Sequence, residues 1–319
     1  MAYTKIHGVL PPMITPFKEN GDVDYEGFAS NVRRFNEAPL AGYLVIGSNS
    51  ETAFLSEEEK LELVRLTKEN AAPGRQILVG SGLDSVRETI RLTNACAKLG
   101  ADAALVLTPS YYSDAMGTKN LIRYFTEVAD NVEIPVLIYN VTKFTHVNIS
   151  ADALAVLSRH PNIVGMKDSN GNVPQLATEL RVADPSFQVM TGTFGAWYPA
   201  LTMGITGIIS AMANCCPEPI AEVQALYDAG RLQEAFDLYQ RWFPVNAAVT
   251  GKYGIGGLKY CADRCGYTGG FVRNPLLDST EQEKKGCAPT ACISPGRISA
   301  CLSWWRASAS SSVWGCGSG

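Results

Sequence analysis

The sequence predicts an α/β fold, a (β/α)8 TIM barrel followed by a C-terminal helical extension. Eight short apolar runs are nearly continuous rather than alternating, which is typical of parallel strands covered on both faces. Segments with helical periodicity separate these runs along the chain. The chain has 319 residues, 46% of them hydrophobic and 18% charged. This length accommodates one barrel of about 250 residues with additional helices.

The expected strands contain the eight apolar runs. They lie at 8–16, 42–49, 76–82, 103–109, 135–141, 162–169, 187–193 and 207–210. An open doubly wound sheet is the alternative way to arrange alternating strands and helices. Such a sheet normally carries a nucleotide-binding loop after its first strand, and the stretch TPFKENG at 15–21 has no such pattern. The barrel is therefore the preferred prediction.

Several expected helices have marked ends. The segment 56–71 opens with Ser56 and has Glu59 three residues later, the spacing of a capping box. The segment 85–100 has a serine at its start and a glycine at its end, and the segment 150–161 stops at a proline. These boundaries place one helix between most pairs of successive strands.

The chain divides into three parts by composition. Residues 1–216 hold the barrel pattern with the candidate active site, and residues 217–286 read as a helical region. Residues 287–319 have no Asp or Glu, eight serines, four cysteines and three of the five tryptophans, without helical or strand periodicity. We expect this tail to be unstructured. A shifted reading frame or an unspliced intron would produce it, and a genuine disordered tail is the alternative.

Composition excludes several classes of partner. The formal net charge is −4 and basic residues are dispersed, so we expect no nucleic-acid partner. Apolar stretches fall short of the roughly 20 residues that cross a bilayer, so we expect no membrane partner. The first residues show neither an apolar signal core nor an Arg-rich presequence, which favours a cytoplasmic protein.

Cysteines and histidines form no recognisable metal-ligand set. Five of the nine cysteines lie before residue 287, and we interpret them as reduced packing residues: Cys96, Cys215, Cys216, Cys261 and Cys265. None of the three histidines ends an expected strand, and the strand ends carry no His/Asp/Glu cluster. The sequence therefore predicts neither a metal nor an organic cofactor.

The carboxyl ends of barrel strands carry the active site in this fold, and few reactive residues stand there. Lys167 ends the sixth run, Tyr139 ends the fifth, and the polar pair Ser48-Asn49 ends the second. A lysine in an apolar barrel mouth loses its proton more easily, and the free amine attacks carbonyl groups. A tyrosine hydroxyl on the adjacent strand suits the proton transfers that follow.

Spacing alone leaves other interpretations open. Lys167 could instead be a solvated strand-end lysine paired with Asp168, and Tyr139 could be a packing residue. Strand alternation would place Ile163, Gly165 and Lys167 on one face. Glu51 could be catalytic, although anchoring its own loop through backbone amides is the better interpretation. The Gly-rich stretch GKYGIGG at 251–257 follows no expected strand, so we do not interpret it as a nucleotide loop.

Four motifs occur in the same order along the chain as the motifs of one known family. They are GSNSE at 47–51, TPSYY at 108–112, IYNV at 138–141 and GMKDS at 165–169. Over about residues 7–280 the chain resembles the dihydrodipicolinate synthase/N-acetylneuraminate lyase family, which are class I pyruvate aldolases. The resemblance implies a barrel with C-terminal helices, assembled as a homotetramer (a dimer of dimers). It also implies a small 2-oxo acid as substrate.

The resemblance assigns a role to each site residue. Lys167 would form the Schiff base with C2 of the 2-oxo acid, and Tyr139 would transfer protons. Tyr112 would be the tyrosine that reaches into a neighbouring subunit's site and supports the proton relay. The substrate-binding residues would be Ser48 and Asn49, which hold the carboxylate, and Gly192 and Ile209, which line the pyruvate pocket.

The same motifs suggest a particular branch. In dihydrodipicolinate synthases an arginine follows the strand-5 tyrosine by five residues, and here that position is Phe144. Lys143 would point elsewhere on an extended segment. The first two motifs, with HPNIVGMKDS at 160–169 and NAAVTGKYGIGGLKY at 246–260, look most like the 4-hydroxy-2-oxoglutarate aldolase or 2-keto-3-deoxy sugar acid aldolase branch. We therefore expect this branch, which cleaves a 4-hydroxy-2-oxo acid to pyruvate and an aldehyde.

Three alternatives to this cleavage remain. One is dihydrodipicolinate synthase-type condensation of pyruvate with an aldehyde. Another is a paralogue that binds a 2-oxo acid without turnover, suggested by Ser50 where the family has a glycine. The third is a decarboxylating or dehydrating relative with the same imine chemistry.

Overall fold

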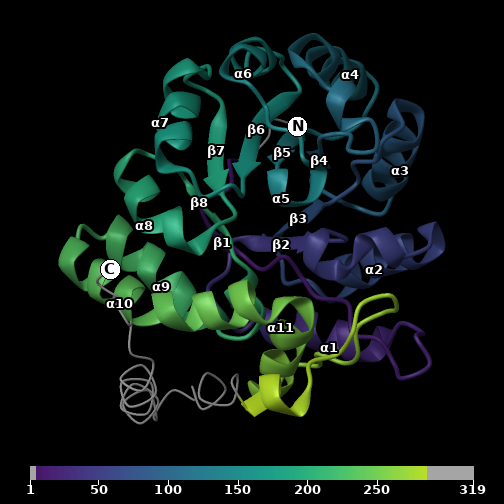
Figure 1. Cartoon of the computed structure of the whole chain (residues 1–319), viewed down its shortest axis with the longest axis vertical. Coiled ribbons are helices and arrows are strands. Elements are labelled where there is room, and N and C mark those ends of the chain that lie inside the picture. Colours follow the sequence, from purple (N-terminus) through teal and green to yellow (C-terminus); the bar gives the residue numbers. More distant parts are fainter. Residues whose placement is uncertain (1–4, 286–319) are drawn as a thin grey trace, which may run out of the picture.

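The computed structural model describes residues 5–285, and their strands form one parallel barrel (Figure 1). The strands are β1 (Gly8–Leu10), β2 (Gly42–Val45), β3 (Gln76–Val79), β4 (Ala103–Leu107), β5 (Val136–Asn140), β6 (Ile163–Asp168), β7 (Gln188–Thr191) and β8 (Gly207–Ile209). Their order is β1-β8-β7-β6-β5-β4-β3-β2, with every pairing parallel.

The ends of this sheet meet and close the barrel. Pro12, just after β1, forms a parallel bridge with Leu44 of β2. The Met13 N–H donates to the Leu44 carbonyl at 2.8 Å, and the Leu44 N–H donates to the Pro11 carbonyl at 3.0 Å. The (β/α)8 prediction is confirmed, and the open doubly wound alternative is wrong because β1 and β2 are bonded to each other.

Helices surround the strands, as Figure 1 shows. They are α1 (Tyr25–Phe35), α2 (Glu57–Asn70), α3 (Val86–Lys98), α4 (Thr118–Asp130), α5 (Thr142–Thr145), α6 (Ala151–Leu157), α7 (Val173–Val182), α8 (Phe194–Thr202), α9 (Pro217–Asp228), α10 (Leu232–Asn246) and α11 (Gly254–Arg264). The predicted capping box at the start of α2 is confirmed. Ser56 accepts from the Glu59 N–H, and the Glu59 carboxylate accepts from the Ser56 N–H.

Buried side chains fall into two layers. The outer layer lies between strands and helices, and the inner layer fills the barrel. The inner cluster contains one or two residues from most strands: Leu10, Leu44, Leu78, Ala103, Leu105, Leu137, Tyr139, Met190 and Ile209, with Ile6 and Val141. Tyr139 and Ile209 therefore face into the barrel.

Strand β6 has a register shift beside β5. The pairing skips Val164 after Ile163, so Ile163 packs in the outer layer while Val164 contacts the inner cluster. The expectation that Ile163 shares a face with Gly165 and Lys167 is wrong, because the bulge breaks the alternation between them. From Gly165 onward the residues pair with inward-facing residues of β5, so Lys167 still points into the barrel.

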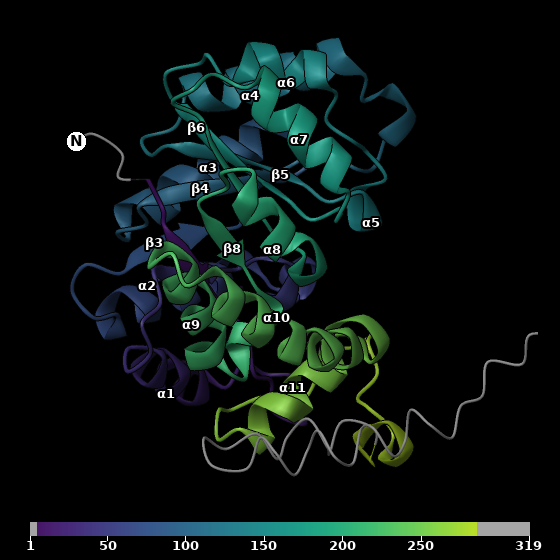
Figure 2. The ribbon, with the colours of Figure 1, turned by 90° about the vertical axis from the view of Figure 1, so that its left-hand side faces the viewer.

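The C-terminal helices lie together at one end of the molecule (Figure 2). Helix α9 packs against β1, and α10 packs against α9 and α8. The chain after α11 contacts α1: Arg34 donates to the carbonyls of Cys265 and Gly266, and Asn31 exchanges two hydrogen bonds with Thr268. The proposed domain boundaries stay a prediction. The expectation of an unstructured tail at 287–319 falls outside the described residues.

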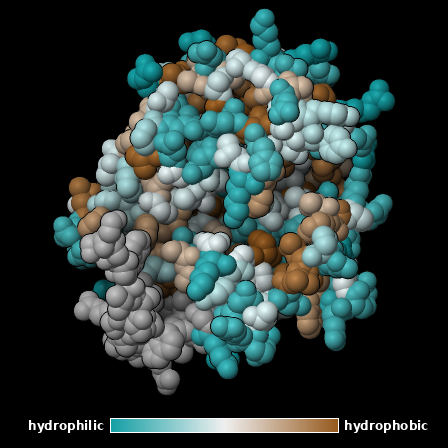
Figure 3. All heavy atoms as spheres, viewed as in Figure 1, coloured by the Kyte–Doolittle hydropathy of each residue, from teal (hydrophilic) through white to brown (hydrophobic). Residues whose placement is uncertain are grey.

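The surface carries mixed side chains. Figure 3 shows hydrophilic residues over much of one face, with hydrophobic residues between them in small groups. Within residues 5–285, no helix is long and apolar enough to cross a membrane.

Candidate active site

Lys167 is the residue before the end of β6, and its side chain lies inside the barrel. It is 4% exposed and pairs in register with Tyr139 of β5. The Lys167 Nζ lies 4.3 Å from the centroid of the Tyr139 ring. The structure thus brings together the two residues that the sequence placed at neighbouring strand ends.

The alternative of a solvated ion pair between Lys167 and Asp168 is wrong. Both residues are buried, and no ion pair joins them in the part of the chain that the structure describes. The Asp168 carboxylate instead accepts from the side-chain amides of Asn140, Asn170 and Gln175 and from the Asn170 N–H. Burial raises the pKa of Asp168, which these hydrogen bonds oppose.

Gly192 lies directly against the lysine. It follows β7, and its N–H donates to the Asp168 carbonyl at 2.7 Å. A Cβ added at Gly192 would lie 2.0 Å from Ser169 Oγ and 2.5 Å from Lys167 Cε. Any side chain here would displace the side chains of Ser169 and Lys167, so the glycine matters through close approach rather than through backbone conformation.

Ser48 and Asn49 lie in a short 3₁₀ turn, Ser48–Ser50, just after β2. The Asn49 Nδ2 is buried and finds no hydrogen-bond partner among residues 5–285. Two residues flanking this turn have left-handed backbones, Ile46 with φ 51° and Glu51 with φ 56°. Such conformations in non-glycine residues concentrate at functional sites. The turn therefore presents a free amide donor from a strained loop.

Ser50 fits this turn without requiring a glycine. Its φ is not positive, its side chain is buried, and its hydroxyl donates to the Met13 carbonyl at 2.6 Å. The backbone strain falls one residue later, on Glu51. The replacement of glycine by Ser50 therefore gives no structural reason to expect a defective site.

Tyr112 is not part of the cluster around Lys167 within one chain. It is 72% exposed, after β4, and its ring makes an edge contact with Tyr111, with centroids 5.0 Å apart. Asp84 holds this loop by accepting from the N–H groups of Ser110 and Tyr111. Of the predicted site residues, Tyr112 is the one that a single chain leaves on the surface.

The segment after β5 differs from its expected form. Residues Thr142–Thr145 form the short helix α5, not an extended strand, because the Phe144, Thr145 and His146 N–H groups bond back along the chain. Lys143 and Phe144 are both exposed, and Phe144 is 55% exposed. The side chain at position 144 therefore does not line the barrel interior beside Lys167.

Sequence reasoning missed two groups of buried or partly buried polar residues. One is Lys259 with Arg273, which contact Glu51 from the C-terminal region. The other is Glu179 on α7, which is 3% exposed and joined to Asp168 through Gln175. An isolated charge on the apolar face of an expected helix was the available signal for Glu179 and Lys259.

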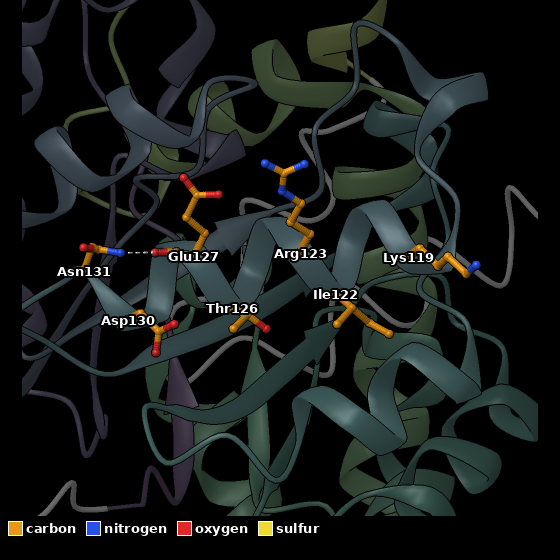
Figure 4. Close-up of a pocket in the computed structure, with 7 residues that line it drawn as sticks. All are labelled: Lys119, Ile122, Arg123, Thr126, Glu127, Asp130 and Asn131. Carbon is orange, nitrogen blue, oxygen red and sulfur yellow. Dashed lines mark hydrogen bonds between the residues drawn. The ribbon is translucent and has the colours of Figure 1, made fainter.

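A separate hollow lies on the outer face of α4 (Figure 4). It is lined by Lys119, Ile122, Arg123, Thr126, Glu127, Asp130 and Asn131, all from this helix and its end. None of the predicted site residues lines it. Within residues 5–285, no group of three or more His, Cys, Asp or Glu side chains could hold a metal ion.

A buried lysine inside a (β/α)8 barrel, with a tyrosine beside it, defines the class of protein. It is a class I carbon–carbon lyase, an enzyme that works through a lysine Schiff base. The family model for the dihydrodipicolinate synthetase family matches residues 5–291. The chain belongs to this family.

Comparisons with named relatives agree. A 4-hydroxy-tetrahydrodipicolinate synthase from Methanospirillum hungatei is 34% identical over 278 residues, covering 86% of this chain and 94% of that protein. The one from Rhizobium meliloti is 31% identical over 275 residues, covering 86% and 93%.

Solved structures give the same picture. The chloride-inhibited dihydrodipicolinate synthase of Acinetobacter baumannii, complexed with pyruvate, is 29% identical with a TM-score of 0.85, covering 91% of this chain and all of that one. YagE from E. coli K12, a family member also complexed with pyruvate, is 26% identical with a TM-score of 0.83, covering 89% and 97%.

These findings correct the expected reaction. Relatives at 31–34% identity are named 4-hydroxy-tetrahydrodipicolinate synthase, not aldolases of 4-hydroxy-2-oxoglutarate or sugar acids. The expectation of retro-aldol cleavage, and of that branch, is therefore contradicted. It rested on Phe144 and on motif similarity, and the structure places the Phe144 side chain on the surface, outside the barrel interior.

Proposed function

We propose that this enzyme condenses pyruvate with an aldehyde through a Schiff base on Lys167, and that its product is the one in its relatives' name, 4-hydroxy-tetrahydrodipicolinate. The observation that carries the proposal is the buried Lys167, packed against the Tyr139 ring and Gly192 at the barrel mouth. The relatives' names give the direction of the reaction, which is synthesis.

The reaction follows from the chemistry of an amine in a dry site. The Lys167 amine attacks C2 of pyruvate, and loss of water gives an imine. The imine draws electrons from the methyl group, which loses a proton to form an enamine. The enamine carbon attacks the aldehyde carbonyl, and hydrolysis of the new imine returns the free lysine. Tyr139 lies beside the amine and is the proposed proton carrier.

Four further residues are proposed to hold pyruvate. The buried Asn49 Nδ2 is available to donate to its carboxylate, and Ser48 lies in the same turn. Gly192 has no side chain and so leaves room for the Lys167 side chain at the place where pyruvate is proposed to bind. Ile209 belongs to the apolar cluster that includes Tyr139 and is proposed to form the wall of the pocket.

The product's name constrains the aldehyde. A tetrahydrodipicolinate has seven carbons: a six-membered ring of five carbons and one nitrogen, and two carboxylates. Pyruvate supplies three of these carbons and one carboxylate. The remainder is a four-carbon aldehyde with an amino group and a carboxylate. Because Phe144 offers no cation, another group must bind this carboxylate.

We also propose a homotetramer, a dimer of dimers, in which the exposed Tyr112 enters the neighbouring subunit's site and joins the proton relay. Tyr112 is 72% exposed in one chain and packs against Tyr111. An exposed aromatic pair is typical of a surface that another subunit covers, which supports this role. A cytoplasmic location stays a prediction.

Borohydride trapping tests the Schiff base. Pyruvate with borohydride should add one reduced pyruvyl group at Lys167, located by peptide mass spectrometry, and Lys167→Ala should not react. Tyr139→Phe should still be trapped but lose turnover by about 10²–10⁴-fold. No adduct on the unmodified enzyme would refute the proposal. A panel of aldehydes with and without an amino group and a carboxylate then identifies the second substrate.

A further inference from the structure

One fully buried ion pair lies outside the cluster around Lys167. Lys259 Nζ on α11 is 2.5 Å from Glu51 Oε1, and both side chains are 1% exposed. Removing two charges from water costs several kcal/mol each, so such a pair is weak evidence for a purely stabilising role. Its position is informative, because Glu51 directly follows the turn that contains Ser48 and Asn49.

The Glu51 carboxylate is held from two sides. Lys259 contacts Oε1, and the Arg273 backbone N–H donates to Oε2 at 2.8 Å. The Glu51 backbone has φ 56° and its N–H closes the turn by donating to the Ser48 carbonyl. A left-handed non-glycine residue costs about 1–3 kcal/mol and persists only where its surroundings hold it. The carboxylate contacts hold this residue together with its backbone hydrogen bonds, in which the Glu51 N–H donates to Ser48 and the Glu51 carbonyl accepts from the Phe54 N–H.

Lys259 is itself held in place. Its Nζ donates to the Phe271 carbonyl at 2.5 Å and lies 4.4 Å from the centroid of the Phe17 ring. Burial lowers the pKa of Lys259, and the charge on Glu51 opposes this. Lys259 therefore joins the loop after β1, the loop after β2 and the segment after α11.

Arg273 connects the segment after α11 to the start of α2 and to the loop after β2. Its guanidinium makes two 2.7 Å hydrogen bonds to Glu59 of α2 and also donates to the carbonyls of Gly21 and Phe54. Figure 1 shows α11 and the chain after it beside α1 and near α2. Lys259 and Arg273 of the C-terminal region thus contact Glu51, at the end of the Ser48–Ser50 turn, from outside the barrel.

We propose that Lys259 is a positioning residue for the turn that binds the carboxylate of the 2-oxo acid, and that it acts through Glu51. This inference rests on the proposed function, in which Ser48 and Asn49 hold that carboxylate. Lys259 does not touch substrate. It keeps Glu51 in its left-handed conformation, and this conformation sets where the Asn49 amide lies.

The test compares pyruvate binding with stability. Lys259→Met keeps the side-chain length but removes the charge. The pyruvate concentration for half-maximal borohydride trapping should rise at least about tenfold, because small displacements of binding groups have large effects. The kcat at saturating pyruvate and the KM for the aldehyde should change by less than about threefold.

Two further variants make the result decisive. Val223→Ala, in the core of α9, lowers the melting temperature without touching the turn, so it should leave half-saturation by pyruvate unchanged. If Lys259→Met does not fold, Glu51→Gln with Lys259→Met leaves no unpaired buried charge and should show the same weak pyruvate binding.

The outcomes separate the two proposals. A folded Lys259 variant that binds pyruvate within twofold of the unmodified enzyme overturns the positioning role and leaves the Schiff-base proposal intact. Absence of any adduct on the unmodified enzyme overturns the proposed function, and the positioning role with it.

Discussion

At the scale of single residues, the space around Lys167 determines what the candidate site can do. The lysine side chain lies between the Tyr139 ring and the backbone of Gly192. The buried Asn49 amide has no hydrogen-bond partner within residues 5–285 and is proposed to donate to the substrate carboxylate. Each of these features can therefore be tested by changing a single residue.

Gly192→Ala tests the space beside the lysine. The new Cβ would lie 2.5 Å from Lys167 Cε and 2.0 Å from Ser169 Oγ, so the lysine must move. We expect the rate of pyruvate trapping to fall about 100-fold, measured by mass spectrometry after borohydride quenching.

Gly117→Ala is the matched control for this change. Gly117 has φ −75°, and a Cβ there meets no atom within 4 Å. It should trap pyruvate at the unmodified rate. Equal trapping by Gly192→Ala and Gly117→Ala would contradict the role assigned to Gly192.

At the scale of elements, helix α7 is coupled to strand β6 through buried acids. Gln175 of α7 donates to both Asp168 and Glu179. Burial, with a smaller contribution from the Asp168 charge, raises the pKa of Glu179 to about 8. Glu179 therefore keeps its proton in the folded protein at neutral pH, while an unfolded chain would lose it.

The effect of pH on stability follows. Between about pH 4.5 and 8 the unfolded state binds fewer protons at Glu179, so the free energy of unfolding falls as pH rises. Glu179→Gln removes this titration. We expect thermal melts of the two proteins to be similar near pH 5. The variant should be more stable by up to about 4 kcal/mol near pH 8.

The control is Glu127→Gln, which removes one carboxylate from the exposed face of α4 (Figure 4). A stability difference for Glu179→Gln that does not change between pH 5 and pH 8 would show that Glu179 does not hold its proton in the folded state.

At the scale of the whole molecule, the site is proposed to need a second chain. Mixing two inactive variants tests this. Lys167→Ala lacks the nucleophile and Tyr112→Ala lacks the hydroxyl, but a mixed dimer contains one site with both residues. Activity should therefore appear when the two variants are unfolded and refolded together.

Two controls accompany the mixing. Lys167→Ala mixed with Tyr139→Phe should stay inactive, because both residues belong to the same chain's site. Sedimentation velocity should give a tetramer. A monomer, or no recovered activity in the mixture, would contradict the proposed role of Tyr112.

The tail provides another test at this scale. Every predicted site residue lies between Ser48 and Ile209, so removing residues 287–319 should leave pyruvate trapping unchanged. We also expect the melting temperature to stay within a few degrees. A large loss of either property would show that the tail contributes to the domain.

Local patterns were enough to predict much of the fold and part of the site. Continuous apolar runs predicted the parallel strands, and the Ser56–Glu59 spacing predicted the start of α2, because both signals arise within a few residues. The motif around Lys167 indicated a reactive amine at a strand end. The predicted cleavage was wrong, because relatives at 31–34% identity are named 4-hydroxy-tetrahydrodipicolinate synthase. The short helix α5 that exposes Phe144 was not visible in the local pattern either.

The sequence by itself determined the barrel, the helix cap at Ser56 and the lysine in β6. Strand and helix periodicity, capping residues and motifs are all set by residues close together in the chain. Only the tertiary structure decided which residues meet across the chain. The bulge beside Val164 reflects pairing with β5, and Lys259 contacts Glu51 only because α11 folds over the loop after β2. Such contacts depend on closure of the whole barrel, which brings together residues that no local pattern relates.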